Sequence, residues 1–148
     1  MDVKDMSRIR SFSLDHDIME KGLYLNMESH GITTWDLRFK TPNGGDYISP
    51  KALHSVEHML ATVLRNSEHK DDVIYFGPMG CRTGFYLLTV NMNYAEVLSL
   101  LRASFKKSLE YTFVPGSAKK ECGNYLEHNL EEAKKECGAY LAVLEALS

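Results

Sequence analysis

The stretch His54-Ser55-Val56-Glu57-His58 is the part of the chain from which both fold and site can be predicted. If it is helical, His54 and His58 lie one above the other on one face, because residues at this spacing are neighbours on a helix. Two such imidazoles can bind one metal ion from a single helix. Glu57 lies beside them, which makes it a candidate proton carrier next to a metal.

The flanking residues favour a helix from about Ser49 to Asn66. Ser49 can cap the free backbone N–H groups, and Pro50 suits the first helical position. A row of leucines follows the helical rhythm, and Glu57 falls in that row. The spacing alone also fits two ordinary polar histidines, and inverted zinc peptidases carry the same five-residue pattern. The motif therefore indicates a metal without selecting a reaction.

Composition narrows the class of protein. The chain has 148 residues, of which 44% are hydrophobic and 25% are charged, as expected for one compact domain over residues 1–148. The net charge of −3 and the lack of a basic block disfavour a nucleic-acid partner. No apolar run approaches the ~20 residues that span a bilayer, and residues 1–10 lack a secretion signal. We therefore expect a cytoplasmic protein without a membrane partner.

Alternating apolar residues predict an antiparallel hairpin from residues 23–27 and 35–39, with Arg38 on its polar face. Arg38 there is either a solvated strand residue or an anchor for an anion or hydroxyl. Two further strands are predicted at 73–76 and 85–91, and further helices at 93–107 and 117–147. We expect an α+β fold, a small single-domain sandwich of a mainly antiparallel sheet packed with helices. An extended arm, residues 1–19, precedes it.

The three cysteines differ in their surroundings, and their small odd number argues against a disulfide framework. Cys81 lies in a glycine- and proline-rich loop beside Arg82, which would favour its thiolate and indicates a functional role. Cys137 lies in the apolar row of the last helix, which predicts core packing. Cys122 lies in the predicted first turn of that helix, where the helix dipole favours a thiolate, and is the better third metal ligand.

A helix over 117–147 places His128 about 240° around its axis from Cys122 at ~100° per residue, so His128 is not expected to share a metal with Cys122. The predicted donors are then two imidazoles and one thiolate, whereas a closed structural zinc site has four donors. The open position suits Lewis-acid chemistry on a carbonyl. With Glu57 and Cys81 as proton carriers, enolisation fits better than hydrolysis, because moving a carbonyl along a chain needs protons at several carbons.

The sequence also resembles the LuxS family of S-ribosylhomocysteine lyases over nearly its whole length. The resemblance is carried by Ser-Phe-Ser-Leu-Asp-His at 11–16, Asp-Leu-Arg-Phe at 36–39, His-Ser-Val-Glu-His at 54–58, Gly-Pro-Met-Gly-Cys-Arg-Thr-Gly-Phe-Tyr at 77–86 and Glu-Cys-Gly-Asn-Tyr-Leu-Glu-His at 121–128. It implies a homodimer with two sites at its interface, which cleaves S-ribosylhomocysteine to homocysteine and 4,5-dihydroxy-2,3-pentanedione, the autoinducer-2 precursor. It also implies one divalent metal per subunit, Fe2+ in the family, with Zn2+ or Co2+ able to take the same position.

The roles implied by this resemblance are metal binding, acid–base chemistry and, from the neighbouring subunit, contact with the sugar. Metal binding falls on His54, His58 and Cys122. Acid–base chemistry falls on Glu57 and Cys81, and contact with the sugar falls on Ser11, His16 and Arg38. Two positions depart from the family pattern. Tyr75 stands where an acid is often found, and Gly77 where serine is frequent. The resemblance therefore gives no acidic partner for the homocysteine amino group at residue 75.

Two other classes of protein remain open. In an inverted-zincin-like metal-dependent hydrolase, Glu57 would activate water and Cys81 would be incidental. Such enzymes usually take a downstream glutamate as third ligand, so contact between Cys122 and the metal distinguishes the two enzymes. A structural zinc module would need a fourth protein ligand, for which the sequence offers no good candidate.

Overall fold

The computed structural model of the chain describes residues 1–9 and 14–148. Ser11, one of the predicted sugar-binding residues, lies outside the described residues. In chain order the elements are η1 (Val3–Asp5), β1 (Gly22–Ser29), β2 (Ile32–Arg38), α1 (Pro50–Arg65), β3 (Val73–Pro78), β4 (Gly84–Val90), α2 (Tyr94–Ser108) and α3 (Leu130–Glu145). Except at η1, which was not predicted, and at the start of α3, these elements agree closely with the sequence prediction.

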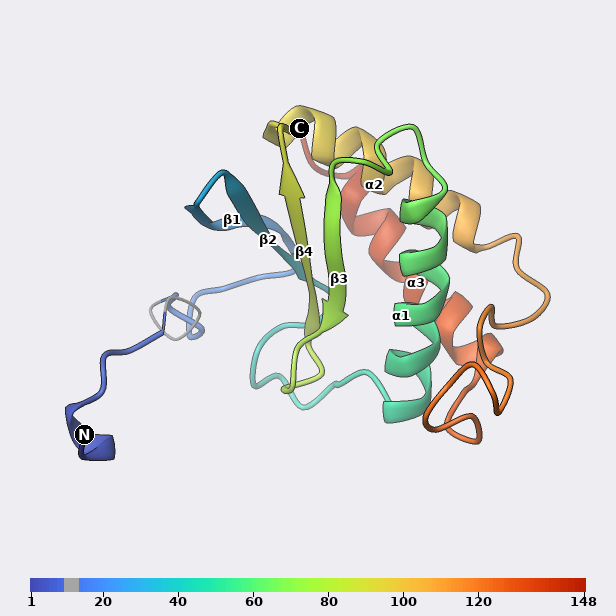
Figure 1. Cartoon of the computed structure of the whole chain (residues 1–148), viewed down its shortest axis with the longest axis horizontal. Coiled ribbons are helices and arrows are strands. Elements are labelled where there is room, and N and C mark those ends of the chain that lie inside the picture. Colours follow the sequence, from blue (N-terminus) through green and yellow to red (C-terminus); the bar gives the residue numbers. More distant parts are fainter. Residues whose placement is uncertain (10–13) are drawn as a thin grey trace.

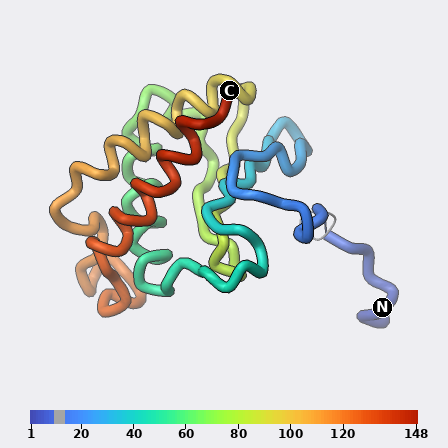
Figure 2. Tube along the Cα trace, turned by 180° about the vertical axis from the view of Figure 1, so that it is seen from behind, coloured from blue at the N-terminus to red at the C-terminus, as the bar shows by residue number. Residues whose placement is uncertain are grey.

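The four strands form one antiparallel sheet in the order β1-β2-β4-β3. The three helices lie together on one side of this sheet (Figure 1), and the view from behind shows the same two layers (Figure 2). The predicted α+β fold with an antiparallel sheet is therefore confirmed. Residues 1–9 lead away from the body of the fold (Figure 1). Among the described helices, none is long and apolar enough to cross a membrane.

The β1–β2 connection is a two-residue turn. Its residues, His30 and Gly31, both have positive φ angles, 56° and 78°. This conformation matches the right-handed twist of the paired strands, and glycine adopts it without steric cost. The register shifts by one residue between Met27 and Leu25, so that Asp36 of β2 is paired with Tyr24 on one side and Tyr86 on the other.

Helix α1 begins as predicted. The Ser49 hydroxyl accepts a hydrogen bond from the Ala52 N–H at 3.2 Å, and Pro50 occupies the first turn. The fully buried face of α1 is formed by Ala52, Ser55, Val56, Met59, Leu60 and Leu64. Glu57 is half-buried at the edge of this face rather than within it. The buried face of α1 therefore differs from the predicted apolar row, and the Glu57 carboxylate lies outside it.

Helix α3 starts later than predicted. It begins at Leu130, where the Asn129 side chain accepts a hydrogen bond from the Glu132 N–H at 3.0 Å, and residues 117–129 form turns instead. Gly123 is a poor helix former, and the Glu127 carbonyl of this segment accepts a hydrogen bond from His54 of α1 instead of continuing a helix. The prediction of one helix from Ser117 was wrong. Cys122 thus lies in a turn, outside any helical first turn.

The core lies between the sheet and the helices. Phe39, just after β2, stacks on Tyr140 of α3 with ring centroids 4.1 Å apart. The Tyr140 hydroxyl donates to the Gly22 carbonyl at 2.9 Å, which ties α3 to the start of β1. Cys137 is fully buried in the same core, as its apolar row predicted. The packing fixes α1 and α3 relative to the sheet and so positions the side chains described next.

Candidate active site and metal centre

His54 and His58 project from α1 toward the segment of turns that precedes α3. His54 Nδ1 lies 2.9 Å from the Glu127 carbonyl oxygen, and His58 Nδ1 lies 3.0 Å from that of Pro115. A carbonyl only accepts, so each Nδ1 carries the proton and donates it. Each Nε2 is then left with a lone pair, which is the usual arrangement of a metal-binding histidine.

Cys122 brings its sulfur to these free nitrogens. Its Sγ lies 3.5 Å from His54 Nε2 and 4.0 Å from His58 Nε2. A tetrahedral ion with bonds of about 2.3 Å to sulfur and about 2.0–2.1 Å to nitrogen separates those atoms by about 3.6 Å. The spacing and the donor types of these three side chains therefore fit a divalent metal ion.

His128 belongs to the same group, although a helix over residues 117–147 was expected to keep it away from Cys122. Its Nε2 lies 3.7 Å from Cys122 Sγ, and its ring stacks on His54 with centroids 3.9 Å apart. Among the described residues, His54, His58, Cys122 and His128 form the group able to hold a metal, with ligand atoms all within 4.8 Å of one another. We call this group the metal cluster. The exclusion failed because no helix joins Cys122 to His128.

A signal for His128 was present in the sequence. Asn129 followed three residues later by Glu132 is a helix-start pattern, and it places His128 before the helix instead of within it. Burial, together with the nearby charges of His54 and His58, lowers the pKa of His128 to about 4. Its imidazole is therefore neutral near pH 7 and keeps a lone pair.

Glu57 is outside the metal cluster but faces a pocket beside it. This pocket has a volume of about 350 Å3 and is lined by Glu57, His58, Ala61, Thr62, Arg65, Tyr75, Phe76, Pro115 and Gly116. A Cβ on Gly116, which has a φ of +66°, would come within 3.3 Å of His58 Nδ1. Glycine at this position lets the chain pass close to the histidine. A carboxylate and an imidazole of the metal cluster thus share one small pocket.

The two departures from the family pattern lie against each other. The phenol of Tyr75 covers Gly77, and a Cβ on Gly77 would overlap the Tyr75 hydroxyl. Tyr75 is 50% exposed and forms part of the pocket that contains Glu57. The glycine therefore makes room for the tyrosine, so the two replacements are physically coupled.

Cys81 lies elsewhere, in the turn between β3 and β4, and is exposed. Its Sγ is 3.0 Å from Thr83 Oγ1, which accepts a hydrogen bond from Arg38 Nη1 at 2.7 Å. Because Arg38 can only donate, the Thr83 proton is free to point at the sulfur. Arg38 also donates to both carboxylate oxygens of Asp36, at 3.1 and 2.5 Å. We call these four residues the Cys81 network.

The Cys81 network is buried except at the thiol. Arg38 is 1% exposed and Asp36 is fully buried. Burial raises the pKa of the Asp36 carboxyl, and the hydrogen bond and charge of Arg38 oppose that shift. The charge of His16 also acts on Asp36, so this predicted sugar-binding residue lies near the network. Arg82, expected to support the thiolate, donates instead to the Ile48 carbonyl at 3.1 Å.

The structure therefore separates the predicted site residues into two groups within one chain. The metal cluster lies between α1 and the turns preceding α3, whereas the Cys81 turn joins strands β3 and β4 of the sheet. Arg38, which was predicted to act with the neighbouring subunit, is linked through Thr83 to Cys81 of its own chain.

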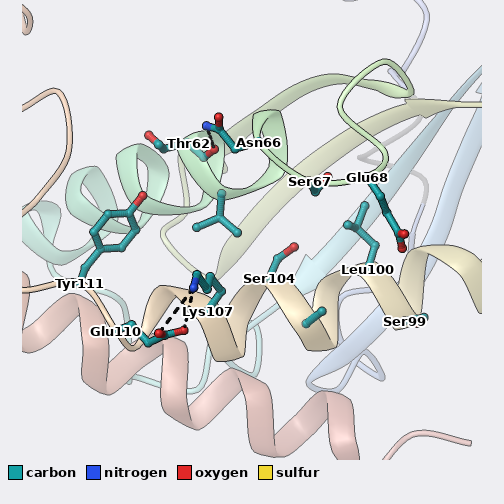
Figure 3. A pocket seen from close by; sticks show the side chains of 12 residues that line it. Thr62, Asn66, Ser67, Glu68, Ser99, Leu100, Ser104, Lys107, Glu110 and Tyr111 are labelled. Atoms are coloured by element: carbon teal, nitrogen blue, oxygen red, sulfur yellow. Dashed lines mark hydrogen bonds and ion pairs between the residues drawn. The ribbon is translucent and has the colours of Figure 1, made fainter.

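Another cavity is separate from both groups. It has a volume of about 660 Å3 and lies between α1 and α2 (Figure 3). Its lining includes Thr62, Asn66, Ser104 and the ion pair of Lys107 with Glu110, 3.3 Å apart. It contains none of the residues predicted for the site.

The fold and the metal cluster define a class: small α+β proteins in which histidines of one helix and a cysteine from a later segment could hold a metal ion. A sequence profile of the S-ribosylhomocysteinase (LuxS) family matches residues 9–147. The chain therefore belongs to the LuxS family.

Individual relatives agree with this assignment. An S-ribosylhomocysteine lyase from Borreliella afzelii (strain PKo) is 42% identical over 146 residues, which cover 94% of this chain and 93% of the relative. One from Clostridium acetobutylicum is 37% identical over 150 residues, covering 97% and 95%. One from Finegoldia magna is 39% identical over 145 residues, covering 94% and 92%. The likeness thus extends over nearly the full length of each protein.

Proposed function

We propose that this protein is an S-ribosylhomocysteine lyase, which cleaves its substrate to homocysteine and 4,5-dihydroxy-2,3-pentanedione. The observation that carries the proposal is the convergence of two imidazoles and one thiolate beside a pocket that contains a carboxylate, in a chain of the LuxS family. The inverted-zincin alternative gains no support, because the third donor is Cys122 and the described metal cluster contains no carboxylate.

The metal proposed for His54, His58 and Cys122 is Fe2+, with Zn2+ or Co2+ able to take its place, since this donor set accepts all three. A divalent ion held there supplies Lewis-acid polarisation of a carbonyl. The chain fixes the donors beforehand: the carbonyls of Pro115 and Glu127 orient the two imidazoles. Such outer partners contribute to metal affinity as well as to geometry.

Two side chains carry protons in the proposed reaction. The Cys81 thiolate removes and returns protons at carbon during two carbonyl shifts along the sugar, and Thr83 donates a hydrogen bond that stabilises the anionic sulfur. Glu57 moves protons at the sugar oxygens and assists β-elimination of the homocysteine thiol from C5. No change of oxidation state is needed, because each shift moves two hydrogens within one molecule.

The separation of the Cys81 network from the metal cluster supports a homodimer with shared sites. We propose that each site combines the metal cluster and Glu57 of one protomer with His16, Arg38 and Cys81 of its partner, together with Ser11. Cys81 is added to the partner's share because Thr83 joins it to Arg38 in one chain. The two halves of a site would then approach each other only on assembly.

The reaction and its thiols also suggest a place in the cell. Metal binding through Cys122 and proton transfer through Cys81 both need reduced sulfur, which a reducing cytoplasm maintains. All three cysteines are free in the structure. We therefore propose a cytoplasmic enzyme whose second product is the precursor of autoinducer-2.

The first experiment measures activity directly. Anaerobically purified protein is incubated with S-ribosylhomocysteine, and release of free thiol is followed with time. Steady thiol release that depends on added Fe2+ or Co2+ is the expected result. Absence of thiol release from protein with full metal occupancy would contradict the proposed reaction.

The second experiment tests the shared site. Cys81→Ala and Glu57→Gln proteins, each inactive, are mixed under conditions that allow subunits to exchange, and mixed dimers should recover one working site. Cys81→Ala mixed with Arg38→Lys should not recover, because both lesions lie in the same half-site. If exchange is verified by mass and the first mixture stays inactive, the proposed division between protomers is wrong.

A further inference from the structure

The pocket beside His58 has an aromatic wall. Tyr75 and Gly77 are two residues apart on β3, so their side chains lie on the same side of the strand. Because Gly77 has no Cβ, the Tyr75 ring can lie over it, and a Cβ there would overlap the Tyr75 hydroxyl. Half of Tyr75 stays exposed, and the residue lines the pocket together with Glu57 and His58. The ring therefore forms a surface that a bound molecule can contact.

The charged groups of this pocket are few. Among the described residues that line it, Glu57 carries the carboxylate and Arg65 the guanidinium, and His58 belongs to the metal cluster. Arg65 Nη2 donates to the Ile74 carbonyl at 2.9 Å, which holds the guanidinium beside β3. A guanidinium has five N–H donors, so Arg65 keeps donors for an anion. The pocket thus offers one cation and one carboxylate.

The three polar parts of the substrate tail find unequal partners in this lining. The tail of S-ribosylhomocysteine carries a thioether, an ammonium group and a carboxylate. Arg65 suits the carboxylate, and an aromatic ring suits the thioether, because sulfur packs favourably against aromatic rings. Glu57 moves protons in the proposed reaction, so its charge is not a constant partner for the ammonium group. The phenol of Tyr75 is a neutral hydrogen-bonding group and supplies no opposite charge.

We propose that Tyr75 is a specificity-determining residue, which contacts the thioether and methylene groups of the tail and leaves the amino group unselected. This inference rests on the proposed lyase function of the site. Selection at the end of the tail then falls on the carboxylate, through Arg65. The class of ligand that fits is a ribosyl thioether whose tail ends in a carboxylate, with or without an α-amino group.

Equilibrium binding of three thioethers tests the selectivity. The protein is Co2+-loaded Cys81→Ala, which lacks a proposed proton carrier but keeps the pocket lining, and titration calorimetry gives each Kd. The ligands are S-ribosylhomocysteine and the analogous thioethers of 4-mercaptobutanoate, without the amino group, and of 3-aminopropanethiol, without the carboxylate. The first two should have Kd values within about threefold of each other, and the third should bind at least about tenfold more weakly.

A change at Tyr75 tests the role of the ring. In the same Cys81→Ala background, Tyr75→Asp places a carboxylate in the pocket wall. S-ribosylhomocysteine should then bind at least about tenfold more tightly than the 4-mercaptobutanoate thioether, because only the former can pair its ammonium group with the new charge. Ile74→Asp is the matched control, since Ile74 is exposed, lies next to Tyr75 and is outside the pocket lining. It should keep the wild-type ratio.

The outcomes separate this inference from the reaction. If the 4-mercaptobutanoate thioether binds more than about threefold more weakly than S-ribosylhomocysteine while Tyr75 is present, the proposal is wrong. This reading does not depend on the folding of Tyr75→Asp. An unchanged ratio in folded Tyr75→Asp protein would equally remove Tyr75 from the role. Failure of all three thioethers to bind would overturn both proposals, whereas binding without thiol release from the unaltered protein would contradict the lyase reaction alone.

Discussion

The metal cluster and the Cys81 network are both held by hydrogen bonds, yet they are assembled in opposite senses. In the metal cluster, His54 and His58 each donate from Nδ1 to a backbone carbonyl, and the lone pairs of their Nε2 atoms point toward Cys122. In the Cys81 network, Arg38 donates a hydrogen bond to Thr83, and the Thr83 hydroxyl is then free to donate one to the Cys81 sulfur. The first arrangement accepts a cation and the second stabilises an anion, so the same element, sulfur, is prepared for two different tasks.

The largest expected effects separate these two sulfurs. Cys122→Ala should lose both metal and activity, because it removes a donor. Cys81→Ala and Glu57→Gln should keep the metal and lose turnover by at least the ~10²-fold typical of a missing general acid or base. Elemental analysis and thiol release measure the two effects. Full metal occupancy in Cys122→Ala would contradict the ligand assignment.

The same variants distinguish the two proton carriers. Without Cys81, exchange of carbon-bound hydrogen of the substrate with solvent deuterium should stop. Without Glu57, some exchange should persist although thiol release fails. Exchange into C2 at the wild-type rate in Cys81→Ala would remove Cys81 from the proposed role.

A second prediction concerns the stability of the Cys81 network. Arg38→Ala should lower the free energy of unfolding by about 3–5 kcal/mol, because it leaves the buried Asp36 carboxylate without a partner. The double variant Asp36→Leu, Arg38→Met removes both charges and should recover much of that loss. Urea unfolding measures both. If the single and double variants are equally unstable, packing rather than the unpaired charge accounts for the effect.

A smaller effect is expected at the third cysteine. Burial raises the pKa of the Cys137 thiol to about 12, so it stays protonated at neutral pH. Cys137→Ala should leave the metal in place and cost about 1–2 kcal/mol of stability through lost packing. In alkylation at pH 7.5, Cys81 should react first and Cys137 only on unfolding. Early labelling of Cys137 in native protein would contradict its placement in the core.

The smallest effect on activity is predicted for Tyr75 and Gly77, which lie against each other at the wall of the Glu57 pocket. Gly77→Ser should displace the Tyr75 ring and raise KM a few-fold with kcat nearly unchanged, because only the wall of the Glu57 pocket moves. In a Tyr75→Asp background the same Gly77→Ser change should have little effect, since the overlap is gone. Steady-state kinetics of the four proteins measure the coupling. Additive effects of the two changes would show that the residues act independently.

The features that local pattern controls were predictable from the sequence. Ser49 and Pro50 start α1, histidine spacing places two imidazoles on one face, and alternation gives the strands. Alternation also placed Arg38 and Asp36 on one face of β2, but it does not reveal what covers that face. Their burial depends on side chains from neighbouring strands and turns, which no local pattern contains.

The conformation of the segment before α3, residues 117–129, could not be predicted from local pattern. Residues 117–129 carry an apolar rhythm that continues into α3, yet the exposed Leu126 shows that this rhythm is not used. The hydrogen bonds from His54 to Glu127 and from His58 to Pro115 join residues far apart in the chain, and they hold the segment in turns. The place of His128 in the metal cluster was missed for that reason.

A metal ion in the metal cluster would also cross-link distant parts of the chain. A metal ion bound by His54 and Cys122 would join residues 68 positions apart, as a disulfide would. By the chain-entropy relation for such a link, closing a loop of that size restricts the unfolded state by about 4 kcal/mol. The turns between Pro115 and His128 have little packing of their own, so such a link would add to the hydrogen bonds that hold them. A metal ion bound there is therefore expected to add to the stability of the folded chain, and the protein should unfold more readily when the ion is removed.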